Sequence, residues 1–267
     1  KSATASTTTS GSTSSITATV TAVDGAAGYA WFIGTSGAEK LVAITAINSV
    51  ALTALPNSGN QALSALASAD YSADSTYNSD GLLTYARGSL NATVYTLPTG
   101  TPGTGTVLSA SGRGTISQID AALAQFYNAY KFCPDEMLLS LTDYSNAVTK
   151  IINNGGAPIA RITQDAGSPQ NIQAGILAMQ YVAPNGQIIR MRIHPSMPQG
   201  TILLYSKALP YAGTGIGAVM QRKTRRDWYA TEWPLRTRKW EYGVYADQVL
   251  QHYAPFSMIK ITNIANG

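Results

Sequence analysis

The stretch from Gly114 to Gly156, GTISQIDAALAQFYNAYKFCPDEMLLSLTDYSNAVTKIINNGG, contains the clearest secondary-structure signals in the chain. Six apolar residues recur at helical spacing in its first part: Ile116, Ile119, Leu123, Phe126, Tyr127 and Tyr130. Thr115 and Gln118 fit a capping box at the start of this predicted helix. The Cys133-Pro134 pair predicts its end, because a residue before proline disfavours the helical conformation.

The rest of this stretch predicts a strand followed by a second helix. EMLLSL, residues 136–141, is short and apolar enough for a buried strand. The second helix is predicted over Asp143–Asn153, with Thr142 as its cap and Gly155-Gly156 as its stop. The helix–strand–helix order indicates a domain of the α+β class.

Strand signals dominate the chain after this stretch. Asn185-Gly186 separates two β-prone runs and predicts a hairpin, and GTILLYS, residues 200–206, predicts a further strand. From Arg226 to Gln248 polar residues mostly alternate with aromatic or aliphatic ones, interrupted by Pro234. This alternation predicts one long C-terminal strand that lies partly at a sheet edge.

The N-terminal part of the chain has a different character. Residues 1–15 are rich in Ser and Thr and predict a flexible lead-in. Residues 16–97 show short β-branched and aromatic runs divided by turns, which predict a small all-β sandwich with an irregular connection and Trp31 in its core. Residues 98–114, dense in Gly, Thr and Pro, predict a linker, and residues 115–267 form the predicted α+β domain.

The composition excludes several classes of protein. Only 12% of residues are charged, about half the usual share, so the surface is expected to be polar but weakly charged. A single cysteine, Cys133, excludes an internal disulfide framework and a cysteine-based zinc site. The sequence contains no run of about 18 apolar residues, so no membrane span is expected.

No group of residues suggests catalysis. His194 and His252 lack a carboxylate or cysteine at metal-ligand spacing, and Cys133 lacks a C-x-x-C partner and is interpreted as a buried, inert thiol. The GTGIG segment, residues 213–217, lacks the spacing of a phosphate-binding loop. The sequence therefore predicts no catalytic, cofactor or metal site, and a protein that is not an enzyme.

The segment QRKTRRDWYATEWPLRTRKWEYG, residues 221–243, is the remaining strong signal. Its net charge of +4 equals that of the whole chain, and it holds three of the four tryptophans. It could form a subunit interface, a water-facing edge strand or a nucleic-acid groove. On one long strand Arg236, Arg238, Trp240, Tyr242 and Val244 would share a face, with basic residues on the other face too, which favours an interface. The candidate interface residues are Arg225, Arg226, Trp228, Trp233, Arg236, Arg238 and Trp240.

Three stretches together resemble a known family. TRRDWYATEWPLRTRKWEYGVYADQVLQHYAPFSMIKITNIA, residues 224–265, resembles the C-terminal strand of tailed-bacteriophage major capsid proteins of the Hong Kong 97 type. The stretch from Gly114 to Gly156 is similar to the helix–strand–helix part of their shell domains, and residues 186–211 to the strands before the final segment. The N-terminal module resembles the immunoglobulin-like or fibronectin-like domains inserted in some of these proteins.

This resemblance implies a structural subunit of an icosahedral capsid, built from hexamers and pentamers, without enzymatic activity. It implies assembly in the cytoplasm of a bacterial host into a virion that encloses double-stranded DNA, with non-specific DNA contacts and possible decoration proteins as partners. The family also has an N-terminal arm and an extended loop before the shell domain, and no such segment is expected here before residue 16. The open alternatives are an extracellular adhesive or carbohydrate-binding β protein and a DNA-binding protein that uses residues 222–239.

Overall fold

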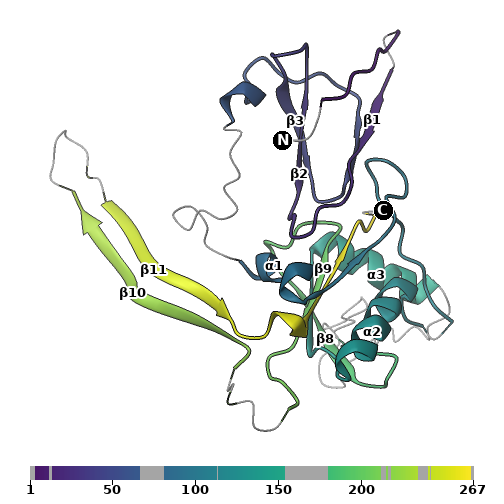
Figure 1. The fold of residues 1–267 in the computed structure, drawn as a ribbon, viewed down its shortest axis with the longest axis vertical. Coiled ribbons are helices and arrows are strands. Elements are labelled where there is room, and N and C mark those ends of the chain that lie inside the picture. The colour runs from purple at the N-terminus through teal and green to yellow at the C-terminus, as the bar shows by residue number, and fades with distance from the viewer. Residues whose placement is uncertain are drawn as a thin grey trace, which may run out of the picture.

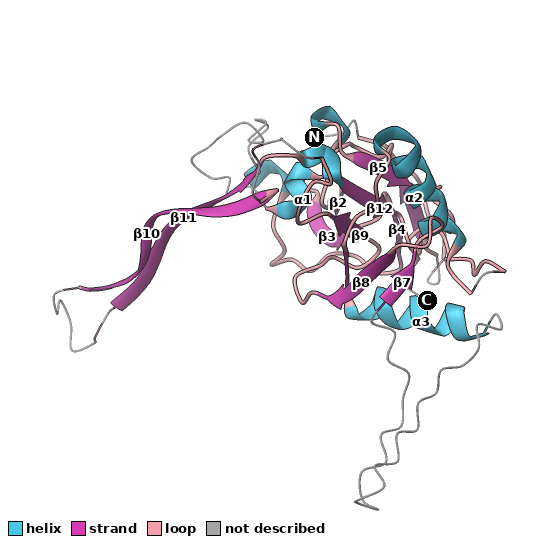
Figure 2. Ribbon diagram, turned by 90° about the horizontal axis from the view of Figure 1, so that it is seen from below, coloured by secondary structure: helices cyan, strands magenta, loops and turns pink. Residues whose placement is uncertain are grey.

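A six-stranded mixed sheet forms the centre of the body in the computed structural model (Figures 1 and 2). The structure describes residues 4–11, 14–66, 81–112, 114–153, 180–211, 215, 218–233, 240 and 242–265. The strand order is β5 (Thr93–Thr96), β12 (Met258–Thr262), β9 (Ile202–Tyr205), β6 (Glu136–Leu139), β8 (Ile188–Ile193) and β7 (Gln180–Val182). β5 runs parallel to β12 and β6 runs parallel to β8, whereas the other neighbours are antiparallel. The predicted strand at residues 136–141, the Asn185-Gly186 hairpin and the strand at 200–206 are confirmed.

One face of this sheet carries the main core. Alternate residues of the four inner strands point to it and are buried: Ile259, Ile261, Ile202, Leu204, Met137, Leu139, Ile189 and Met191. Helices α2 (Ser117–Tyr130) and α3 (Leu141–Asn153) supply the opposing side chains, among them Phe126 and Ala147. The core therefore consists of two helices packed on one sheet face, and both predicted helices are confirmed.

The ends of α2 differ from the predicted ones. No side chain caps its first turn, because the Thr115 hydroxyl donates to Asp120 Oδ2 (2.6 Å) and Gln118 Oε1 accepts from the backbone N–H of Ser109 (2.9 Å). The predicted capping box is therefore wrong. Lys131, in the left-handed conformation (φ 63°), ends the helix two residues before Cys133.

The start of α3 also differs from the predicted one. Ser140, and not Thr142, caps it: the backbone N–H of Asp143 donates to Ser140 Oγ (3.1 Å), and the Ser140 hydroxyl donates to Asp143 Oδ2 (2.6 Å). The buried Asp143 carboxylate also accepts from the backbone N–H of Gly200 (3.0 Å to Oδ2). This contact ties α3 to the turn before β9.

The opposite sheet face is covered in parts. Helix α1 (Leu82–Tyr85) and neighbouring residues pack on β9 and β12, in a second cluster that includes Leu203 and Met258. Further along the same face, residues of the N-terminal part, among them Tyr29 and Ala46, lie around one cavity with Val94 of β5. No helix among the described residues is both long and apolar enough to cross a membrane.

The N-terminal part contains two ribbons of two strands each. β1 (Ile16–Thr19) pairs with β4 (Ser49–Leu52), and β2 (Tyr29–Ile33) pairs with β3 (Lys40–Thr45). Trp31 is half-buried there and donates from Nε1 to Thr45 Oγ1 (2.8 Å). β5 lies in the predicted module of residues 16–97, but it belongs to the central sheet, because it pairs with β12.

The segment predicted as a linker, residues 98–114, also packs on the body. Thr106 forms a β-bridge with Ile264, and the Leu108 side chain is buried in the main core. Its described residues are therefore part of the folded body, which differs from the predicted division of the chain. Glycine at 100 and 105 suits this packing, since both have positive φ and a Cβ at Gly100 would lie 2.3 Å from the Gly105 carbonyl oxygen.

The predicted single C-terminal strand is wrong. The chain forms β10 (Met220–Glu232), reverses, and returns as β11 (Tyr242–His252) in an antiparallel hairpin. Period-two alternation runs through both strands, and because a reversal leaves that alternation intact, the pattern could not reveal it. Pro234 lies outside the described residues.

Candidate assembly interface on the β10–β11 hairpin

The β10–β11 hairpin projects from the body like an arm, as both ribbon views show (Figures 1 and 2). Its register pairs Met220 with His252 at the root and Glu232 with Tyr242 at the far end. The pairing is irregular between Thr224 and Tyr229, where β10 carries extra residues. In both ribbon views the far half of the arm lies away from the body (Figures 1 and 2).

The root of the hairpin is held firmly by the body. Met220 packs against the second cluster, and the Tyr85 hydroxyl of α1 donates to the Leu250 carbonyl oxygen (2.8 Å). Val219 is buried, and its carbonyl oxygen accepts from the backbone N–H of Tyr253 (2.8 Å). The arm is thus oriented by the body at one end.

His252 closes the root of the hairpin and has an unusual environment. Its side chain is buried, with its ring 5.6 Å from the Tyr85 ring and Nδ1 accepting from the backbone N–H of Ala254 (3.2 Å). Among the described residues, Nε2 has no hydrogen-bond partner. Burial lowers the pKa of His252 from 6.5 to about 4, because the charged form would lose its hydration.

The burial of His252 predicts that the stability of the hairpin root depends on pH. In the unfolded protein His252 binds a proton near pH 6.5, whereas in the folded protein it stays neutral down to about pH 4. The stabilisation by the root is therefore complete above pH 6.5, and about 2–3 kcal/mol is lost as the pH falls to about 4.5. Thermal unfolding between pH 7.5 and 4.5 should show this loss in the wild type and a smaller one in His252→Phe. Equal pH dependence in both proteins would contradict it.

In the far half of the arm, one side carries four apolar residues beside the charged Glu232, and these four are defined here as the apolar face: Ala230, Tyr242, Val244 and Ala246. Tyr242 lies beside Glu232 and Val244 beside Ala230, so the cross-strand register places them on one side. Tyr242 is 76% exposed and Val244 is 59% exposed. A sheet face with such residues in water is typical of a surface that another protein covers.

The other side of the arm is charged and aromatic. Lys223, Tyr229, Tyr245, Asp247 and Val249 share it by register. The Tyr229 and Tyr245 rings lie 5.8 Å apart, and the Arg226 guanidinium sits 3.7 Å from the centre of the Tyr229 ring. Arg225 forms an exposed ion pair with Asp247 (2.5 Å). These contacts order the arm but contribute little stability in water.

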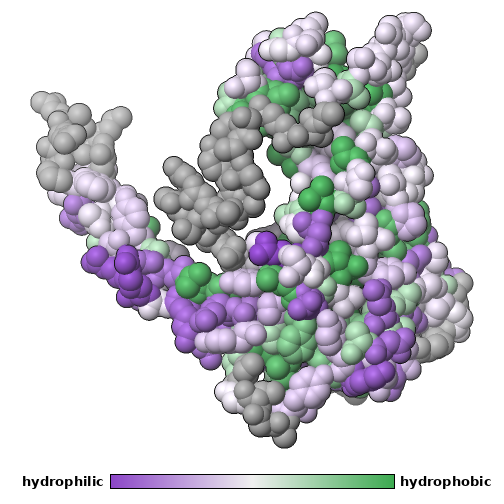
Figure 3. Space-filling model, in the orientation of Figure 1, coloured by the Kyte–Doolittle hydropathy of each residue, from purple (hydrophilic) through white to green (hydrophobic). Residues whose placement is uncertain are grey.

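Five of the predicted interface residues lie on this arm or at its far end: Arg225, Arg226, Trp228, Trp233 and Trp240. The three tryptophans are exposed, by 63%, 51% and 74% respectively. Arg236 and Arg238 lie outside the described residues. Figure 3 shows that much of the visible side of the arm is hydrophilic.

The sequence interpretation missed the partners across the hairpin. It placed Tyr242 and Val244 on one strand face, but it could not pair them with Glu232 and Ala230, since those pairs form only after the chain reverses. Tyr245 and Asp247 were missed for the same reason. The period-two alternation was the available signal, and it identified the faces of each strand without the pairing.

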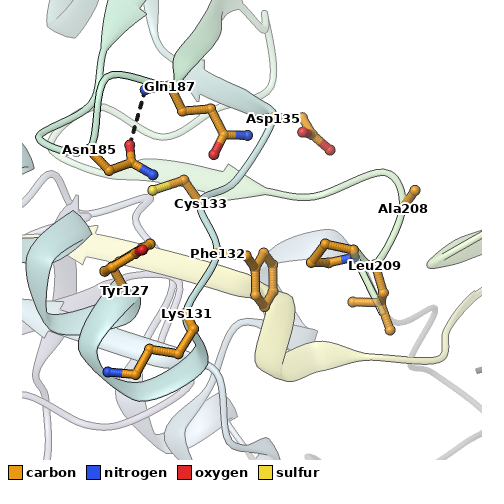
Figure 4. Close-up of a pocket in the computed structure, with 10 residues that line it drawn as sticks. Tyr127, Lys131, Phe132, Cys133, Asp135, Asn185, Gln187, Ala208 and Leu209 are labelled. Carbon is orange, nitrogen blue, oxygen red and sulfur yellow. Dashed lines mark hydrogen bonds between the residues drawn. The ribbon is translucent and has the colours of Figure 1, made fainter. Parts of the chain in front are cut away.

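A second candidate site is a cavity of about 410 Å³ at one end of the sheet (Figure 4). Cys133 lies in it beside the Asn185 amide, whose Oδ1 accepts from the backbone N–H of Gln187 (3.1 Å). Burial raises the pKa of the Cys133 thiol, and the hydrogen bond with Asn185 opposes this shift only in part. Asp135 Oδ2 already accepts from the backbone N–H of Lys207 (3.0 Å). A thiol with a raised pKa and no histidine among the described residues of its cavity is a poor nucleophile.

The remaining chemistry-bearing residues are dispersed. His194 is exposed on the loop after β8, where Nδ1 accepts from the backbone N–H of Ser196 (3.2 Å), and His252 lies at the hairpin root. Within the part of the chain that the structure describes, no three His, Cys, Asp or Glu side chains are grouped to hold a metal ion. The hairpin is therefore the feature with the strongest functional signal.

Comparison with known proteins gives little further information. No protein-family model matches the sequence, and no curated protein matches it. Among solved structures, the chain is similar to the holo-SrpI encapsulin complex from Synechococcus elongatus PCC 7942, with 10% sequence identity and a TM-score of 0.37. The match covers 70% of this chain and 57% of that chain, so this chain spans less than two thirds of its length.

Proposed function

We propose that this chain is a structural subunit that assembles with copies of itself, and that the β10–β11 arm makes the contact. The observation that carries the proposal is the exposed apolar face of an arm whose far half has no packing partner among the described residues. Two-stranded hairpins are only marginally stable alone in water, so an arm of this length is expected to be completed by a partner.

The energetics of the arm suit such a contact. Burying an exposed aromatic or branched side chain contributes about 1.5–3 kcal/mol, and Tyr242, Val244 and Trp240 are all more than half exposed. Tryptophan, tyrosine and arginine are the residues that most often dominate protein–protein contacts. A second copy that covered the apolar face would bury several of them together.

The projecting shape favours an assembly of many copies. An arm that binds a different surface of the next subunit makes a head-to-tail contact, which continues until a ring or shell closes. We further propose that the assembly is a capsid-type shell built from hexamers and pentamers, which encloses DNA in a virion and has no catalytic activity of its own. The resemblance of residues 114–156, 186–211 and 224–265 to Hong Kong 97-type capsid proteins supports this finer proposal, as does the weakly charged sequence.

A matched pair of valines on the same strand tests the role of the arm. Val244→Glu places a charge on the apolar face, whereas Val249→Glu places it on the other side, across from Lys223. We expect Val244→Glu to weaken association at least about 100-fold, the equivalent of about 2.7 kcal/mol, and Val249→Glu to change it little. Light scattering after size-exclusion chromatography measures association, and electron microscopy shows whether closed particles form.

The outcomes separate the levels of the proposal. Equal association of both variants and the wild type would show that the apolar face is not the contact. A wild-type chain that stays monomeric at high concentration would reject self-assembly. Closed particles that contain DNA would support the capsid proposal, whereas open filaments would contradict it and leave the arm as the contact.

A further inference from the structure

Lys260 is a buried lysine in the middle of the central sheet. It lies on β12 between Val94 of β5 and Leu203 of β9, on the sheet face opposite the main core, and only 3% of the residue is exposed. Its ammonium group makes no hydrogen bond and no direct ion pair with any described residue. The side chain is thus buried as a whole, whereas its ammonium group reaches a cavity, where it is available to a ligand.

The Lys260 side chain lines a cavity of about 210 Å³ between the sheet and the N-terminal ribbons. Apolar residues, including Val23, Ala26 and Ala46, form part of its wall. A water molecule takes up about 30 Å³ in the liquid, so the cavity has room for a molecule of several heavy atoms. The cavity is therefore large enough for a small ligand and too small for a peptide.

Two further polar groups line the same cavity. The Asp24 carboxylate is fixed, because its oxygens accept from the backbone N–H groups of Gly88 (3.0 Å) and Ser89 (3.1 Å). The Tyr29 hydroxyl accepts from the backbone N–H of Val23 (3.1 Å), which leaves its own hydrogen available as a donor. The cavity thus presents a cation and a hydroxyl donor together with an anion that does not pair directly with the cation.

Burial lowers the pKa of Lys260, and the Asp24 carboxylate acts in the opposite direction. An anionic group bound next to Lys260 would also favour its charged form. A simple anion would, however, also lie close to the Asp24 carboxylate, which is exposed at the edge of the same cavity. A ligand with both charges avoids this conflict.

We propose that this cavity, named here the Lys260 cavity, binds a small zwitterion, namely an amino acid of the size of glycine or alanine. Its carboxylate would accept from the Lys260 ammonium group and the Tyr29 hydroxyl, and its ammonium group would face the Asp24 carboxylate. The site is formed within one chain and does not depend on self-assembly.

Glycine is the probe that tests the site, and Lys260→Met is the matched variant, because methionine keeps the length of the side chain without its charge. We expect glycine to raise the Tm of the wild type in a saturable way and to give saturation-transfer NMR signals with it. Lys260→Met should lose both responses, although its Tm without glycine should equal or exceed that of the wild type, because burial disfavours the charge that the substitution removes. General stabilisation by glycine as a solute would appear equally in both proteins.

Two other probes test the chemistry. Acetate should bind more weakly than glycine because it lacks the ammonium group, and tryptophan should not bind because of its size. Tyr29→Phe, which removes one donor, should weaken glycine binding and serves as a second variant if Lys260→Met does not fold. The proposal is overturned if glycine affects wild type and Lys260→Met alike, or if acetate binds as well as glycine.

Discussion

A chain in which Asn-Gly replaces residues 221–251 is expected to fold and to remain monomeric at concentrations where the full chain assembles. Met220 and His252 face each other at the root, so a two-residue turn can join them. The main core contains no residue of the arm, and the second cluster contains only Met220. The body should therefore keep its fold while the proposed contact is lost.

Two measurements check the excision. Sedimentation should give the mass of one chain, and the Tm should fall by only a few degrees, because the lost contacts are those of the root, such as the Tyr85–Leu250 hydrogen bond. Assembly of the shortened chain would reject the arm as the contact. An unfolded shortened chain would mean that the arm supports the body, which the two clusters do not predict.

The second large effect is expected for Asp143→Ala. The carboxylate is fully buried and accepts from the Ser140 hydroxyl (2.6 Å) and from the backbone N–H of Gly200 (3.0 Å). The substitution leaves both donors without this acceptor, and each buried unsatisfied group costs about 1–3 kcal/mol. We expect a loss of about 3–5 kcal/mol in the free energy of unfolding, measured by urea denaturation.

Thr142→Ala is the matched control for this prediction. Thr142 is the cap that the sequence suggests, but among the described residues its hydroxyl accepts a hydrogen bond only from Gln199 Nε2 (3.1 Å), at the surface. Its removal should cost less than about 1 kcal/mol. A larger loss for Thr142→Ala than for Asp143→Ala would restore Thr142 as the cap. Asp143→Asn keeps one oxygen acceptor and should be intermediate.

The sequence by itself determined the elements whose signals are local. Helical spacing from Ile116 to Tyr130 predicts α2, and the Asn185-Gly186 turn predicts the β7–β8 hairpin, because both depend on residues a few positions apart. Trp228, Trp233 and Trp240, which the sequence suggests as interface residues, are exposed, and their role in an interface stays a prediction. Local periodicity is enough wherever the partner is close in sequence.

The tertiary structure alone decided what depends on distant partners. Ser140 and Asp143 form the start of α3 together with Gly200, 57 residues away from Asp143, and β5 joins β12 although Thr96 and Thr262 are 166 residues apart. The reversal between β10 and β11 leaves the alternation of both strands unchanged, so only the folded chain shows that Val244 lies beside Ala230. In the sequence Lys260 looks like an ordinary polar residue of a strand. Only the folded structure shows that it lines a cavity together with residues of the N-terminal part. A pattern along the chain specifies which way a side chain points, whereas its partner depends on the path of the whole chain.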